Sequence, residues 1–111
     1  MAIVYRPQRG GLKEAMAEAA AFDSEQELLA YVRASWADKF PEAKFVVKIR
    51  KLSEENIGWL HTRYVCMTDN GIDAPFRHPK VVGMCDSDTF KDMTKEEALS
   101  KAKELFEQQD R

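Results

Sequence analysis

Both histidines and both cysteines of this 111-residue chain lie in one stretch, which runs from His61 to Cys85. Imidazole and thiolate groups are the ligands that zinc prefers, but zinc sites commonly supply them in close pairs, with only a few residues between two ligands. The spacing here, His61, Cys66, His78 and Cys85, contains no such pair. In an extended strand, His61 and Cys66 would also point to opposite faces. The stretch is therefore more typical of a hairpin than of a metal centre, and we expect no metal or other cofactor.

Cys85 could support two other kinds of chemistry. Asp86 and Asp88 follow it closely, which leaves a metal-binding protein as an alternative. His61 on a neighbouring strand could activate Cys85 as a nucleophile. A simpler interpretation is that Cys66 and Cys85 are small buried residues of the core. Since the sequence contains no Gly-x-Ser-x-Gly, phosphate-loop or dinucleotide motif, we expect a protein that is not an enzyme, with a cysteine-dependent enzyme as an alternative.

Positive charge is concentrated in the middle of the chain. The formal net charge is −2, yet residues 44–80 carry seven basic and four acidic side chains. Residues 11–40, in contrast, carry three basic and six acidic side chains, and residues 81–111 carry five and eight. The expected binding surface consists of basic and aromatic residues in this middle segment. They are Lys48, Arg50, Trp59, His61 and Arg63, with Arg77, His78 and Lys80 on a loop at its edge.

Strand alternation is the reason to expect these residues on one face. If Phe45, Val47 and Ile49 face the helices together with Leu60, Tyr64 and Cys66, then Lys48, Arg50, His61 and Arg63 share the other side of the sheet. Cations mixed with an aromatic ring are typical of surfaces that bind nucleic acids or anionic proteins. Because the whole chain is acidic, we expect a protein partner, and nucleic-acid binding is the alternative.

Apolar periodicity and turn residues predict seven elements. They are a strand at 2–6, a helix at 12–22 that neighbouring strands could instead draw into a sheet, a helix from Ser24 to Phe40, strands at 43–52, 57–67 and 80–85, and a helix at 94–109. Ser24 with Glu27 and Thr94 with Glu97 have the spacing of capping boxes, which predicts that helices begin at these points.

The length and composition favour one domain over residues 1–111. The order of elements predicts an α+β fold, in which an antiparallel sheet of three to four strands carries its helices on one face. No apolar run approaches the roughly 20 residues that a membrane-spanning helix needs, and the N-terminus lacks the pattern of an export signal. We therefore expect a cytoplasmic protein that makes no contact with a membrane.

Three segments resemble small uncharacterised proteins of phages, prophages and related mobile elements: "YRPQRGGLKEAMAEAAAFDSEQELLAYV", "NIGWLHTRYVCMTDNG" and "VVGMCD". This resemblance implies an accessory role and no catalytic residue. From Ser24 onward, the order helix, three strands, helix is also similar to the double-stranded RNA-binding domain. The sequence departs from that family at two RNA-contacting elements. Glu96 and Glu97 follow Lys95 where the family has further lysines, and the turn "SEEN" lacks the family's Gly-Pro-x-His element.

Overall fold

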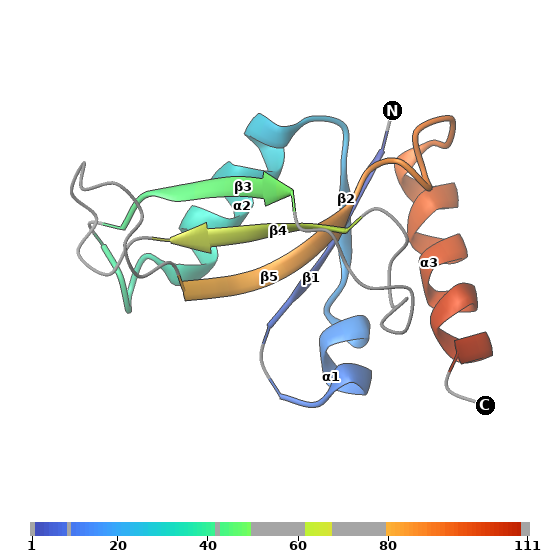
Figure 1. The fold of residues 1–111 in the computed structure, drawn as a ribbon, viewed down its shortest axis with the longest axis horizontal. Coiled ribbons are helices and arrows are strands. Elements are labelled where there is room, and N and C mark those ends of the chain that lie inside the picture. Colours follow the sequence, from blue (N-terminus) through green and yellow to red (C-terminus); the bar gives the residue numbers. More distant parts are fainter. Residues whose placement is uncertain (1, 9, 42, 50–61, 68–79, 110–111) are drawn as a thin grey trace.

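The computed structural model describes residues 2–8, 10–41, 43–49, 62–67 and 80–109 of the chain (Figure 1). Its elements are β1 (Ile3–Pro7), α1 (Leu12–Ala17), β2 (Ala20–Phe22), α2 (Glu25–Trp36), β3 (Phe45–Ile49), β4 (Thr62–Met67), β5 (Lys80–Asp86) and α3 (Lys95–Gln109). The strands form one antiparallel sheet in the order β2-β1-β5-β4-β3. The predicted α+β class is confirmed, with one strand more than expected. Within the described residues, no helix is long and apolar enough to cross a membrane.

The additional strand is β2, at the end of the alanine-rich segment 12–22. The sequence predicts a helix for this segment, with a strand as the alternative. Helix α1 ends at Ala17, and β2 follows after a break of two residues. Strand β2 pairs with β1 through Ile3↔Phe22, Val4↔Ala21 and Tyr5↔Ala20. Alanine favours a helix, but propensity is a weak preference that pairing with a neighbouring strand can override.

Both predicted capping boxes are confirmed. At the start of α2, the Glu27 backbone N–H donates to the Ser24 hydroxyl at 3.2 Å, and the Asp23 N–H donates to the Glu27 carboxylate at 3.0 Å. At the start of α3, the Glu97 N–H donates to the Thr94 hydroxyl, which in turn donates to the Glu97 carboxylate, both at 3.2 Å. The bonds from the Glu27 and Glu97 N–H groups satisfy backbone donors that the first turn of a helix leaves without a partner.

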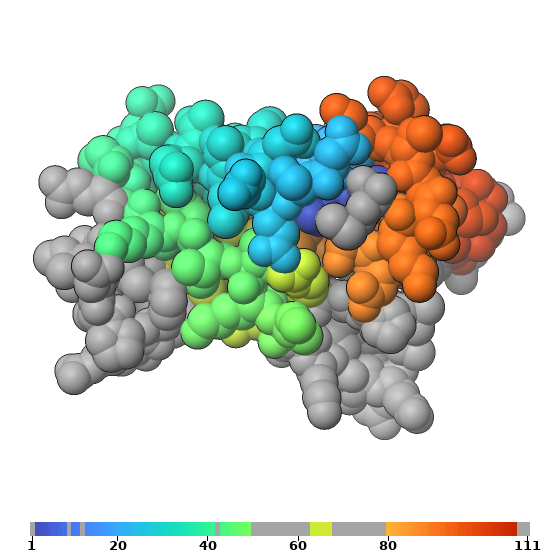
Figure 2. All heavy atoms as spheres, turned by 90° about the horizontal axis from the view of Figure 1, so that it is seen from above, coloured from blue at the N-terminus to red at the C-terminus, as the bar shows by residue number. Residues whose placement is uncertain are grey.

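The helices pack on both faces of the sheet, whereas the sequence led us to expect them on one. Alternate residues of β1 contribute to different hydrophobic clusters: Ile3 and Tyr5 join a cluster with α2, and Val4 joins one with α1 and α3. Helices α2 and α3 accordingly lie on opposite sides of β1 and β2 (Figures 1 and 2). A strand buried on both faces has a continuous apolar run instead of alternation. The run from Ala2 to Tyr5 has this pattern.

The predicted orientation of β4 is also wrong. In the observed register, Phe45 lies opposite Met67 and Val47 opposite Val65, so the odd-numbered residues of β4 face α2. Tyr64 and Cys66 therefore point to the other side of the sheet. Because Val65, Cys66 and Met67 are all buried, strand β4 shows little contrast between its two faces. Its orientation is fixed by pairing with β3 and β5, which the sequence pattern of β4 alone does not reveal.

Candidate functional site

Three residues of the predicted basic surface belong to the described part of the chain, namely Lys48, Arg63 and Lys80. The other five lie outside the described residues: Arg50, Trp59, His61, Arg77 and His78. That this surface binds a partner stays a prediction. The positions of the three described cations, however, can be compared with the single face on which the sequence predicts them.

Lys48 and Arg63 do not share a face of the sheet. Arg63 lies opposite Ile49 in the β3–β4 ladder, and Lys48 lies opposite Tyr64, one position along. Neighbouring positions in a strand point to opposite faces. The expected common face is therefore wrong for these two residues, because it assumed that the even-numbered side of β4 faces the helices.

Two of the described cations interact with α2 and its C-terminal extension. Arg63 forms an ion pair with Glu25 in the first turn of α2. The Lys80 ammonium lies 5.3 Å from the centre of the Phe40 ring, within range of a cation–π interaction. Arg63 and Lys80 therefore help to hold the α2 segment on the sheet, which reduces their availability for an external anion.

Both cysteines are free and buried, as the simpler interpretation of the sequence predicted. Burial raises the pKa of the Cys85 thiol to about 12, although the nearby Arg63 charge opposes this effect. Burial likewise raises the pKa of Cys66, against an opposing effect of Lys48. Since the thiolate is the nucleophilic form, neither environment favours nucleophilic chemistry near neutral pH.

The acidic residue next to Cys85 has a local structural role. The buried Asp86 carboxylate accepts hydrogen bonds from the Thr89 backbone N–H at 3.0 Å and from the Thr89 hydroxyl at 2.8 Å. These bonds close the turn that follows β5. Among the residues that the structure describes, no group of three or more His, Cys, Asp or Glu side chains is placed to hold a metal ion. Both histidines lie outside these residues.

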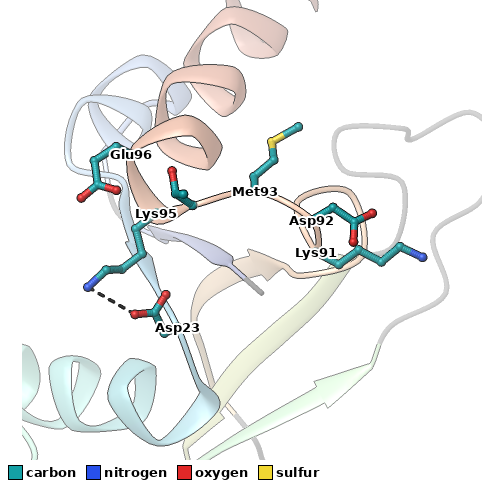
Figure 3. Close-up of a pocket in the computed structure, with 7 residues that line it drawn as sticks. Asp23, Lys91, Asp92, Met93, Lys95 and Glu96 are labelled. Atoms are coloured by element: carbon teal, nitrogen blue, oxygen red, sulfur yellow. Dashed lines mark ion pairs between the residues drawn. The ribbon is translucent and has the colours of Figure 1, made fainter.

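A shallow hollow of about 480 Å³ lies at the start of α3. Its lining consists of Asp23, Lys91, Asp92, Met93, Thr94, Lys95 and Glu96 (Figure 3). Lys95 extends toward Asp23 and forms an ion pair at 3.5 Å, whereas Lys91 and Asp92 point away from that pair (Figure 3). The mixed charges and divergent side chains favour no particular ligand.

A second hollow, of about 220 Å³, is built largely from aromatic rings. We call it the aromatic hollow and define it by its lining residues. They are Tyr5, Pro7, Glu18, Tyr31, Ser35 and Trp36. Tyr5 and Pro7 belong to β1, and Glu18 directly follows α1. The remaining three residues belong to α2. Residues distant in the sequence thus meet where β1 passes beneath α2.

Tyr5 gives the aromatic hollow a fixed base. Its side chain is buried, and its hydroxyl donates a hydrogen bond to the Val82 carbonyl oxygen at 3.2 Å. The ring lies against Gly83, where an added Cβ would come within 2.1 Å of a ring carbon. Tyr31 meets this ring edge to face, with ring centres 6.1 Å apart and an angle of 73° between the planes. Tyr31 itself remains 40% exposed, so it forms an accessible wall.

The sequence contained a partial signal for this site. Tyr31 and Ser35 are four residues apart in the segment predicted as a helix, and Trp36 follows Ser35 directly, so helical spacing alone brings these side chains near one another. Their proximity to Tyr5 and Glu18 depends on how β1 and α1 pack against α2. Sequence periodicity within one element does not reveal such contacts.

No known protein family, curated protein or solved structure matches the chain. The resemblances to phage-encoded proteins and to double-stranded RNA-binding domains therefore gain no support from these comparisons.

Proposed function

We propose that this protein acts by binding a partner, without catalysis, and that the aromatic hollow receives a group of that partner. The observation that carries the proposal is the half-exposed Tyr31 ring standing against the buried Tyr5 ring, next to an open space. Tyrosine and tryptophan side chains contribute disproportionately to binding energy, because each offers a large contact area with few rotatable bonds.

The rigidity of the hollow supports this role. Tyr5 is held by its hydrogen bond to Val82, and Tyr31 also contacts Phe22, with ring centres 5.1 Å apart. Trp36 packs against Phe40 at 5.8 Å. Rings that are already held in place lose little conformational freedom when a ligand binds, so a larger share of the contact energy contributes to affinity.

The environment of Cys85 favours binding over cysteine-dependent catalysis. A thiol with a pKa near 12 is almost entirely protonated at neutral pH, and its side chain is only 1% exposed. A catalytic cysteine instead needs a lowered pKa and access to its substrate. Slow reaction of this thiol with a water-soluble disulfide reagent at pH 7 is the expected result.

Nucleic-acid binding has less support than it had from the sequence. Lys48 and Arg63 point to opposite faces, and Arg63 is paired with Glu25. Binding to phosphates would weaken steeply as the salt concentration rises. Tight binding of RNA or DNA with such a salt dependence would favour this alternative over our proposal.

A fragment screen on the isotope-labelled full chain tests the proposed site. We expect fragments that bind to shift the amide NMR signals of Tyr31 and Ser35 and the indole signal of Trp36. Tyr31→Phe should preserve these shifts and Tyr31→Leu should abolish them, because only the first substitution keeps the ring. Gln26→Ala, at an exposed position of α2, provides the control. Shifts confined to another region, or none at all, would contradict the proposal.

A further inference from the structure

The two edges of the sheet differ in length and in their surroundings. Strand β2 forms one edge with only three residues, and both α2 and α3 contact it. Strand β3 forms the other edge with five residues, and within the described residues it pairs with β4 alone. The segment 43–49, green in Figure 2, lies at the surface in that view. An edge strand presents backbone N–H and C=O groups to which a further strand can bind.

Strand β3 has the composition of a strand that pairs readily. Apart from Lys48, its five residues are β-branched or aromatic, and it contains neither proline nor glycine. Proteins commonly protect an edge by keeping it short, or by placing proline or charged side chains on it. Strand β2 is short, whereas in β3 only Lys48 provides such protection. Ile49, at the end of β3, is 77% exposed, which favours association through this edge.

The two ends of β3 present unlike side chains on the α2 face. At one end, Ile49 extends into solvent. At the other end, Phe45 is buried, and Phe40 and Ala43 are partly buried against the same cluster. The Ala43 N–H donates to the Phe40 carbonyl oxygen at 3.1 Å, which closes the turn that leads toward β3. Because antiparallel strands run in opposite directions, pairing with a second copy would place the exposed end of each strand against the apolar end of the other.

We propose that β3 pairs with β3 of a second copy of this chain, antiparallel and with two-fold symmetry about Val47. Val47 would then lie opposite Val47 of the second copy, Phe45 opposite Ile49, and Val46 opposite Lys48. The two five-stranded sheets would join into one. Such a contact uses the same surface of both copies and closes with two of them.

The charge of Lys48 selects this register. With Val47 at the centre, all five residues of β3 are paired and Lys48 faces a valine. A two-fold register centred on Val46 would place Lys48 opposite Lys44, and one centred on Lys48 would place two lysines opposite each other. Like charges directly opposite each other destabilise a strand pair.

The dimer should be weak and reversible. Only five residues of each copy take part in the strand pairing, whereas a stable interface has about 20–30 residues on each side. Strand β3 supplies none of the residues that line the aromatic hollow, so the dimer goes beyond the proposed function and either proposal can fail without the other.

Sedimentation velocity of the full chain from micromolar to millimolar concentration tests the dimer. We expect a monomer at the low end and a dimer at the high end. Ile49→Lys should weaken dimerisation at least about tenfold, because each dimer would lose two buried isoleucines. Ser100→Lys introduces the same side chain at an exposed position of α3 and should leave dimerisation unchanged. Circular dichroism confirms that the two variants remain folded.

A cysteine at the centre of the two-fold pairing tests the register. Directly opposite residues of antiparallel strands have Cα atoms about 4.5–5.5 Å apart, which is within the range of a disulfide. Val47→Cys should therefore form a disulfide-linked dimer under mild oxidation. Ile49→Cys should form much less, because its opposite residue is Phe45. The buried Cys66 and Cys85 are common to both variants.

Three results would overturn the proposal. A chain that stays monomeric at every concentration would leave the edge of β3 for a strand of another protein. A dimer that Ile49→Lys does not weaken would form through another surface. Equal crosslinking of the two cysteine variants, or none, would exclude the pairing about Val47.

Discussion

The two faces of the sheet are packed with side chains of different size. On the α2 face, the cluster consists of Ile3, Tyr5, Leu28, Val32, Phe45, Val65, Met67, Val82 and Cys85. On the α3 face, it consists of Ala2, Val4, Met16, Ala19, Phe90, Ala98 and Ala102. Four of the seven buried residues in the cluster on the α3 face are alanines, whereas the cluster on the α2 face contains none. The aromatic hollow lies on the α2 face, where Tyr5 of the larger-residue cluster forms part of its lining.

The largest expected effect is a loss of packing on the α2 face. Leu28 is fully buried in α2, and Leu28→Ala should lower the free energy of unfolding by about 3 kcal/mol, through lost burial and the cavity that remains. Chemical denaturation measures this change. Leu99→Ala, at a partly buried position of α3, is the comparison and should cost clearly less. A similar loss for the two variants would remove the distinction between the faces.

On the α3 face, the sensitive change should be an increase in size. Ala98 is fully buried between α3 and the sheet, so Ala98→Leu should destabilise the protein by about 2 kcal/mol through overpacking. Ser100→Leu introduces the same side chain at an exposed position of the same helix and should cost much less. If Ala98→Leu proves neutral in denaturation experiments, the α3 face contains more space than its small side chains indicate.

The buried thiol of the α2 face predicts a loss of stability at alkaline pH. The pKa of Cys85 is raised from an ordinary value near 9 to about 12, so above pH 9 the unfolded chain releases this proton while the folded chain retains it. The contribution of the Cys85 thiol to the free energy of unfolding is fully present below pH 9. It falls between pH 9 and 12 by about 1.4 kcal/mol per pH unit. Denaturation curves at pH 8, 9 and 10 would measure the slope.

Substituting the two cysteines separately shows how much each thiol contributes to the decline in stability above pH 9. Cys85→Ala should flatten the decline above pH 9, whatever its effect on the absolute stability. Cys66→Ala should change the slope in the same direction, because burial also raises the pKa of Cys66. An unchanged slope in Cys85→Ala would show that this thiol does not contribute to the alkaline transition.

The smallest expected effects concern the helix caps, which are alike on the two faces. Ser24→Ala and Thr94→Ala should each cost about 1 kcal/mol, because each removes the acceptor for a backbone N–H in the first turn. Thermal denaturation of the two variants measures the costs. A cost at Ser24 several times that at Thr94 would mean that the start of α2 is also coupled to the Glu25–Arg63 ion pair.

Local sequence signals predicted local structure well. The caps at Ser24 and Thr94, the order of elements from α2 to α3 and the burial of Cys66 and Cys85 all follow from patterns within one segment. The packing of helices on both faces and the orientation of β4 were predicted wrongly. Both depend on strand pairings between segments far apart in the chain, and β4 has apolar residues on both of its sides.

The candidate site could be predicted less well for the same reason. The basic surface was derived from alternation within β3 and β4, and one wrong choice of face separated Lys48 from Arg63. The aromatic hollow combines Tyr5 with Tyr31 and Trp36, which come from elements that meet only in the folded chain. Its chemistry is also invisible in the sequence, since the direction of each hydroxyl proton is set by a backbone carbonyl nearby.

Gly83 contacts the Tyr5 ring but is not among the residues that line the aromatic hollow. Because a Cβ there would come within 2.1 Å of the ring, the ring can rest on β5 only while this position has no side chain. The position of the Tyr5 ring in the hollow thus depends on a residue that does not line it. Engineering at Gly83 therefore offers a means of changing the hollow without altering its lining residues, because any added side chain would force the Tyr5 ring to shift.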